Sequence, residues 1–157
     1  MQLDFLESLL TNNSILLHQT ATNWETAVQI VFKPLLATKA ISEEYIDNVI
    51  KKTKTLGPYY IIAPKLAMPH TRPEEGALKN AFSLVSLTEP VLFADNQPVS
   101  LLIGFCAVDA ETHLSLALPQ IVAIFENPVV IEQIIQANSS TEVMNIIKKI
   151  NYMKYVK

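Results

Sequence analysis

The stretch Val99-Ser100-Leu101-Leu102-Ile103-Gly104-Phe105-Cys106-Ala107 decides the fold of this 157-residue chain. Apolar side chains stand at both odd and even positions along it, with no alternation of apolar and polar residues. A strand that is apolar on both faces is typical of the centre of a sheet that is covered on both sides. The sequence therefore predicts a central strand here, within a covered sheet.

The segments around this strand alternate between strand and helix patterns. Short β-rich runs predict two more strands, at 59–63 and 81–87. Capping residues and the helical spacing of apolar side chains predict helices over the ranges 22–35, 42–57, 109–125, 127–137 and 140–153. We expect Pro34 to distort or end the first helix and Pro119 to kink the third. Helices interleaved with apolar strands indicate an α/β fold, with residues 1–157 forming a single layered domain that has a mixed β-sheet and helices on both faces.

Composition narrows the class of protein. Half of the residues are hydrophobic, which suffices for a continuous core. The first residues lack the features of a secretory signal, and the longest apolar stretch, 101–108, is far shorter than the ~20 residues of a membrane-spanning helix. Cys106 stands alone, which excludes an intramolecular disulfide and fits a reducing compartment. We therefore expect a cytoplasmic protein without direct membrane insertion.

The numbers of basic and acidic residues indicate which classes of partner the chain can bind. The chain has 12 basic and 15 acidic residues, so it lacks the excess positive charge that gives affinity for nucleic acid. It has only three glycines and no glycine-rich phosphate loop, which argues against a nucleotide-dependent kinase. We expect no nucleic acid as a partner, and we expect a protein as the donor of any transferred group.

His70 is the residue on which the chemistry centres. It follows the predicted strand 59–63 in a loop that Pro69 and Pro73 stiffen, because proline fixes φ. A neutral imidazole exposes one nitrogen as a nucleophile, which can take a phosphoryl group without a cofactor. Thr71, Arg72 and backbone N–H groups beside it could stabilise the phosphoryl oxygens. On this pattern alone, a loop histidine without a function is an equally good interpretation.

Other reactive residues are weaker candidates. His18 lies in a polar N-terminal stretch, and we expect it to be incidental surface. Cys106 lies in an apolar run and is expected in the core, not as a phosphoryl acceptor. His70 and His113 could in principle bind a metal with nearby acids, but no fixed ligand spacing supports a metal site. We expect neither a metal nor another cofactor.

The run from Ile62 to Ala77, IAPKLAMPHTRPEEGA, closely resembles the active-site segment of enzyme IIA domains of the bacterial phosphoenolpyruvate-dependent sugar phosphotransferase system, mannitol/fructose class. The flanking residues 57–59 and 84–93 look most like the ascorbate-type branch. A second segment, DAETHL at 109–114, follows an apolar strand where this family carries a second histidine. The resemblance is clearest over 24–150.

This resemblance implies a function. In the family, the first histidine accepts a phosphoryl group from the phosphocarrier protein HPr and donates it to a cysteine of enzyme IIB, which phosphorylates the incoming sugar. The chain would then be a phosphotransferase with His70 as the phosphorylated residue, and it would be linked functionally to a membrane permease. His113 would orient His70 or bind the phosphoryl oxygens; otherwise it is a helix-start histidine packed against the sheet edge. Where mannitol-type members have an arginine, this chain has Lys52 or Lys51, which lacks the bidentate fork.

Several alternatives stay open. The chain could be a stand-alone regulatory module that keeps the enzyme IIA fold and signals phosphorylation state to a protein target, or a metal-dependent hydrolase that uses both histidines. The sequence identifies neither the sugar nor whether the chain forms a homodimer. For transient docking of partner proteins, we expect an apolar rim to which Leu66, Ala67 and Met68 contribute.

Overall fold

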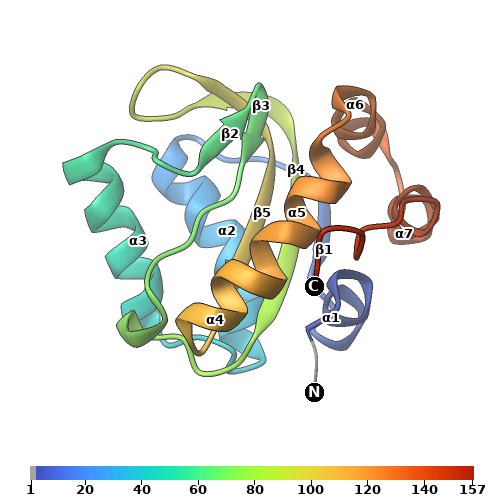
Figure 1. Ribbon diagram of the computed structural model, residues 1–157. Coiled ribbons are helices and arrows are strands. Elements are labelled where there is room, and N and C mark those ends of the chain that lie inside the picture. The colour runs from blue at the N-terminus through green and yellow to red at the C-terminus, as the bar shows by residue number, and fades with distance from the viewer. Residues whose placement is uncertain (1–2) are drawn as a thin grey trace.

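A five-stranded mixed sheet with helices on both faces forms the centre of the computed structural model, which describes residues 3–157 (Figure 1). The strands are β1 (Ile15–Gln19), β2 (Ile61–Ala63), β3 (Lys65–Ala67), β4 (Ala81–Leu92) and β5 (Pro98–Cys106). Their order across the sheet is β1-β4-β5-β3-β2. The β1–β4 and β3–β5 pairs are parallel, whereas the β4–β5 and β2–β3 pairs are antiparallel. The predicted α/β class is confirmed.

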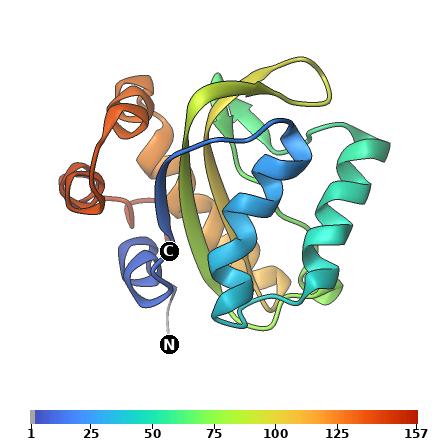
Figure 2. The same cartoon turned by 180° about the vertical axis from the view of Figure 1, so that it is seen from behind.

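Two groups of helices cover the sheet, as the views from opposite sides show (Figures 1 and 2). On one face lie α2 (Trp24–Ala37) and α3 (Glu43–Leu56). The other side carries α1 (Phe5–Thr11), α4 (Ala110–Thr112), α5 (Leu118–Phe125), α6 (Pro128–Gln136) and α7 (Ser140–Lys148). A short 3₁₀ helix, Pro73–Glu75, lies in the loop after β3.

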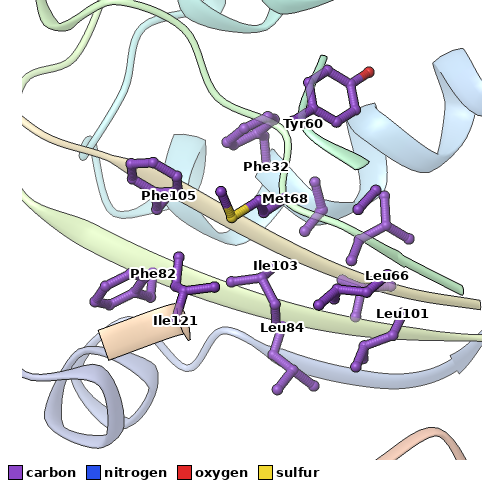
Figure 3. Close-up of a cluster of buried hydrophobic side chains, with 14 of the residues drawn as sticks. Phe32, Tyr60, Leu66, Met68, Phe82, Leu84, Leu101, Ile103, Phe105 and Ile121 are labelled. Atoms are coloured by element: carbon purple, nitrogen blue, oxygen red, sulfur yellow. The ribbon is translucent and has the colours of Figure 1, made fainter. Parts of the chain in front are cut away.

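The central strand is the one that the sequence predicts. Every residue from Val99 to Ala107 is buried, because β5 lies between β3 and β4 and is covered on both faces. Apolar side chains of β4 and β5 form one cluster with Ile121 of α5 and Phe32 of α2 (Figure 3). Burial on both faces explains why the strand shows no alternation of polar and apolar residues.

Helix α2 lies in direct contact with the sheet. Ser83 on β4 donates its hydroxyl to the carbonyl oxygen of Val31, 2.6 Å away. A Cβ atom on Gly104 would lie 2.5 Å from the Ser83 hydroxyl and 3.2 Å from the Phe32 ring. Glycine at 104 therefore permits the close contact between α2 and β5. Pro34 lies inside α2, which continues to Ala37, so it does not end the helix.

Pro119 lies in a helical segment that runs from α4 through a π-helical turn, His113–Ala117, into α5. In this turn the N–H of Leu118 donates to the carbonyl of His113, five residues earlier. Proline has no N–H to donate, and its ring clashes with the carbonyl four residues before it. The sequence predicts a kink at this position, and the structure has a widened π turn directly before the proline.

Three elements were not predicted, and the last helix is shorter than predicted. Helix α1 and strand β1 occupy an N-terminal stretch where the sequence predicted neither. Residues 65–67, expected in a loop, form strand β3, whose first residue, Lys65, has a positive φ of 71°. A three-residue strand between prolines carries too little local signal to be recognised. The last helix ends at Lys148, before the predicted 153.

Within residues 3–157, no single helix has both the length and the hydropathy needed to cross a membrane. The segments Ala110–Phe125 and Pro128–Gln136 meet the criterion only when taken together, and a bend of 85° separates them.

Candidate functional site

The topology of the sheet brings the two histidine segments together. His70 follows β3, and His113 follows β5 through the short helix α4. Strands β3 and β5 are parallel neighbours, so the segments that leave their carboxyl ends meet at the same edge of the sheet. The ring centroids of His70 and His113 lie 5.0 Å apart, with an angle of 67° between the ring planes.

Both histidines line one pocket of about 390 Å³. Its wall also contains the other predicted site residues, Thr71, Arg72 and Lys52. Lys51 is exposed on α3 and does not line the pocket, so the structure places Lys52, and not its neighbour, at the site. The remaining lining residues are Leu56, Tyr59, Pro73, Ala110 and Leu114.

The imidazole of His70 is held in one orientation. Its Nδ1 atom lies 2.7 Å from the carbonyl oxygen of Met68, which can only accept, so Nδ1 carries the proton and Nε2 keeps its lone pair. The ring packs against Phe105 at a centroid distance of 4.5 Å. Tyr59 donates its hydroxyl to the backbone carbonyl of His70 and sets its ring edge-on to the imidazole. Within residues 3–157, Nε2 has no hydrogen-bond partner.

Burial makes His70 a weak base. It lowers the pKa of His70 from 6.5 to about 4, against the opposing effect of the hydrogen bond to Met68. The positive charge of Lys52, and that of His113 when its ring is protonated, lower this pKa further. Burial also lowers the pKa of His113. The His70 ring is therefore neutral near pH 7, which is the state in which a ring nitrogen acts as a nucleophile.

A buried tyrosine of α3, Tyr45, ties the His70 loop to the sheet. The hydroxyl of Tyr45 donates to the carbonyl of Phe105 at 2.8 Å and accepts from the backbone N–H of Thr71 at 3.1 Å. Its ring packs edge-on against Phe32. Tyr45 thus joins α3, the end of β5 and the residue after His70. No local sequence signal distinguishes it from an ordinary core tyrosine.

Glu75 organises the polar side of the pocket. Its Oε1 atom accepts a hydrogen bond from the hydroxyl of Thr71 at 2.7 Å and pairs with the ammonium group of Lys52. These two contacts lower the pKa of Glu75. Thr71 is buried, and both of its donors are engaged, the hydroxyl by Glu75 and the N–H by Tyr45. Thr71 therefore supports the loop in this structure.

Arg72 differs from its neighbours. Its side chain is exposed at the pocket, and among residues 3–157 its guanidinium group forms no ion pair. It is thus a cation at the pocket that no carboxylate neutralises. Guanidinium groups suit phosphate because their N–H groups can contact two oxygens at once.

Two other predictions concern residues outside the pocket. Cys106 is completely buried, and burial raises the pKa of its thiol to about 12, so its expected place in the core is confirmed. His18 is exposed on β1, at the edge of the sheet away from β3, and its Nε2 lies 3.0 Å from the side-chain oxygen of Asn138.

The residues predicted to form the apolar rim of the site are wrong. Leu66, Ala67 and Met68 are buried, because β3 lies between β2 and β5 instead of forming a surface loop. The exposed apolar side chains at the pocket are those of Leu56 and Leu114, which are 67% and 64% exposed, together with Tyr59. They come from the end of α3, the segment before β2 and the π turn.

Within residues 3–157, no group of three or more histidine, cysteine, aspartate or glutamate side chains is arranged to hold a metal ion.

Comparison with known proteins identifies the family of the chain. Residues 8–150 match the family model described as phosphoenolpyruvate-dependent sugar phosphotransferase system, EIIA 2. The chain belongs to this EIIA family. The resemblance inferred from the two histidine segments is thereby confirmed, and the chain is a phosphoryl-carrier component of a sugar phosphotransferase system (PTS).

The relatives of this EIIA chain are similar to it in sequence along more than nine tenths of its length. The ascorbate-specific PTS system EIIA component of Mycoplasma pneumoniae is 40% identical over 156 residues, which cover 99% of this chain and 98% of that protein. The protein of the same description from Escherichia coli is 40% identical over 147 residues, covering 92% and 96% of the two chains.

Solved structures share the fold. The crystal structure of the PTS IIA protein PtxA from Streptococcus mutans superposes with a TM-score of 0.94 at 38% identity, and 99% of each chain is covered. The IIA protein in a complex of enzyme IIAMTL with phosphorylated enzyme IIBMTL from Escherichia coli has a TM-score of 0.75 at 22% identity, with 87% and 94% covered. This second likeness shows the fold alone.

Proposed function

We propose that His70 of this EIIA chain accepts a phosphoryl group from phosphorylated HPr and passes it to a cysteine of enzyme IIB, for coupled uptake of ascorbate. One observation carries the proposal. The proton on Nδ1 of His70 is bound to the carbonyl of Met68, so the lone pair of Nε2 is free beside His113 in an open pocket. The names of the relatives support ascorbate as the substrate of the system.

The transfer needs no added base. Nε2 of neutral His70 attacks the phosphorus of the donor, a new P–N bond forms, and the bond between phosphorus and the donor's nitrogen breaks, with the electron pair leaving on the donor imidazole. In the second step, a thiolate of enzyme IIB attacks the same phosphorus, and the P–N bond to Nε2 breaks. His70 then regains its lone pair and is ready for another cycle.

The surroundings of His70 support a charged group on Nε2. A phosphoryl group carries close to two negative charges near pH 7. Arg72 and Lys52 supply positive charge at the pocket, and His113 lies near enough to offer a ring N–H. Such groups stabilise phosphoryl transfer by position and charge.

The partners would dock on the rim of the pocket. The exposed apolar side chains of Leu56, Tyr59 and Leu114 surround a reactive centre, as expected for a transient protein contact. The carrier would act in the cytoplasm, as a single domain, and its phosphoryl group would pass through enzyme IIB to the substrate that the membrane permease takes up.

Phosphorylation of histidine variants tests this assignment. Labelled phospho-HPr is incubated with the wild type, with His70→Gln and with a control, His18→Gln, which changes an exposed histidine on β1. We expect label on the wild type and the control, and none on the His70 variant, with unchanged circular dichroism in all three. Persistent labelling of His70→Gln would refute the assignment.

Transfer to enzyme IIB separates the carrier from a stand-alone regulatory module. The phosphorylated protein is mixed with purified ascorbate-type and mannitol-type IIB proteins, and the loss of label from the chain is followed in time. We expect rapid transfer to the cysteine of the ascorbate-type protein. Retention of label in the presence of both would favour a regulatory role.

A further inference from the structure

A carboxylate lies at the site where a phosphoryl carrier would be expected to gather positive charge. Glu75, at the end of the 3₁₀ helix Pro73–Glu75, pairs with Lys52 of α3 and accepts from Thr71, the residue after His70. The Lys52 and Glu75 side chains are only 27% and 25% exposed, so water screens the pair incompletely. The cation contributed by α3 is thus already neutralised by a carboxylate.

Lys52 lies close enough to His70 to affect it. Both residues line the same pocket, and the charge of Lys52 helps to lower the pKa of His70. A phosphoryl group on Nε2 would therefore compete with Glu75 for the ammonium group. Of the two cations at the pocket, Arg72 remains available without such competition.

We propose that Glu75 is a positioning residue that holds Lys52 while His70 is unphosphorylated and, by competing for Lys52, keeps phospho-His70 labile enough to pass its phosphoryl group on. This inference rests on the proposed function, in which His70 is the phosphorylated residue. Two unopposed cations would stabilise the phosphorylated state and thereby raise the barrier to onward transfer. Glu75 removes part of that stabilisation through its charge.

A purely structural role for Glu75 predicts the opposite sign. If Glu75 only braced the loop through Thr71, its loss would loosen the site and shorten the lifetime of phospho-His70. If it restrains Lys52, the loss of its charge must lengthen that lifetime. Glu75→Gln keeps the shape and can still accept from Thr71, so it removes mainly the charge.

The lifetime of the phosphorylated protein is the decisive measurement. His70 is phosphorylated with potassium phosphoramidate, a small donor that needs no HPr, and the modified residue is identified by peptide mass spectrometry. Hydrolysis to inorganic phosphate, in which water attacks phosphorus and the P–N bond breaks, is followed by phosphorus NMR at pH 7. The wild type is compared with Glu75→Gln and with the matched control Glu74→Gln. Glu74 precedes Glu75 in the chain, and its side chain is exposed.

We expect phospho-His70 to live roughly three- to tenfold longer in Glu75→Gln than in the wild type, the size of effect of one partly screened charge. Glu74→Gln should change the lifetime less than about twofold. A lifetime that is unchanged or shorter in Glu75→Gln would overturn the inference.

A second variant, Lys52→Met, tests the link through Lys52, and its lifetime by itself does not depend on the folding of Glu75→Gln. Lys52→Met should shorten the lifetime, because the phosphoryl group then faces Glu75 without its counter-ion. In a double-mutant cycle, Glu75→Gln should lengthen the lifetime less in the Lys52→Met background than in the wild type. Fully additive effects would show that Glu75 does not act through Lys52.

The chemical donor also separates this inference from the proposed function. If phosphoramidate labels His70 but phospho-HPr does not, the proposed partner is wrong, and the Glu75 comparison still decides the inference. If phosphoramidate modifies His113 or His18 and never His70, both are overturned.

Discussion

The rings of His70 and His113 lie 5.0 Å apart between centroids, although strands β4 and β5 separate the two residues in the chain. The ring of Phe105 contacts both, at 4.5 Å from His70 and 5.0 Å from His113. Within residues 3–157, the ring nitrogens of His113 have no hydrogen-bond partner. Its ring is thus free to donate to a group carried on Nε2 of His70.

Replacement of His113 should therefore slow transfer without removing the acceptor. We expect His113→Ala to reduce the rate of phosphorylation by phospho-HPr about 100-fold, the usual effect of losing one donor to a developing negative charge. His113→Gln should restore part of the rate, because its amide can donate a hydrogen bond. Rapid-quench kinetics with His18→Ala as the control measure this, and an unchanged rate in His113→Ala would assign His113 a structural role only.

The depressed pKa of His70 should make folding stability depend on pH. Between pH 6.5 and about 4, the unfolded chain binds a proton at His70 that the folded chain does not, so stability falls as the pH falls through this window. Protonation of His70 in the unfolded chain should lower the free energy of unfolding by about 2 kcal/mol when the pH falls from 7 to 5. Urea unfolding of wild type and His70→Gln at both pH values measures the difference. Equal pH dependence in the two proteins would contradict the lowered pKa.

The tautomer of His70 can be observed directly. In nitrogen-15 NMR spectra at pH 7, Nδ1 of His70 should show the signal of a protonated ring nitrogen and Nε2 that of an unprotonated one, because Nδ1 donates to Met68. Both signals should shift together only when the pH approaches about 4. Titration of His70 near 6.5 would show instead that the ring is solvated.

Loss of the Tyr45 hydroxyl should loosen the loop that carries His70. Tyr45→Phe leaves the N–H of Thr71 and the carbonyl of Phe105 without their buried partner, which should cost about 1–3 kcal/mol of stability. Because Thr71 follows His70, phosphorylation should also slow. Tyr155→Phe, which changes an exposed tyrosine, should alter stability by less than about 0.5 kcal/mol and serves as the control. Wild-type kinetics in Tyr45→Phe would show that the hydroxyl does not position the loop.

Gly76 should tolerate no side chain. Its φ is +122°, and an added Cβ would lie 2.7 Å from the backbone nitrogen of Tyr45, which cannot move without moving α3. We expect Gly76→Ala to destabilise the protein by about 3 kcal/mol or more, whereas Gly57→Ala, with a φ of +79° and no atom within 4 Å of its Cβ, should cost only about 1–2 kcal/mol. Thermal unfolding of both variants distinguishes a steric conflict from backbone strain alone, and equal costs would contradict the predicted clash.

Much of the fold could be predicted because its signals are local. The apolar run from Val99 to Ala107 predicted the central strand, and the capping residues Asp109 and Asn127 accept the hydrogen bonds expected at helix starts. Strand β3 could not be recognised, because its three residues pair with β5 through contacts distant in sequence. The same error placed Leu66 and Met68 on the rim of the pocket when they belong to the core.

By itself, the sequence determined which residues could carry the chemistry: a histidine stiffened by prolines and a second histidine after an apolar strand. Only the tertiary structure decided that these two share a pocket, since that depends on β3 and β5 being parallel neighbours. The tertiary structure also decided the protonation state of His70 and the ion pairing of Lys52. The lowered pKa of His70 arises chiefly from burial, and the pairing of Lys52 with Glu75 joins residues from separate elements. Burial and strand order are properties of the whole packed chain, so no local pattern of residues encodes them.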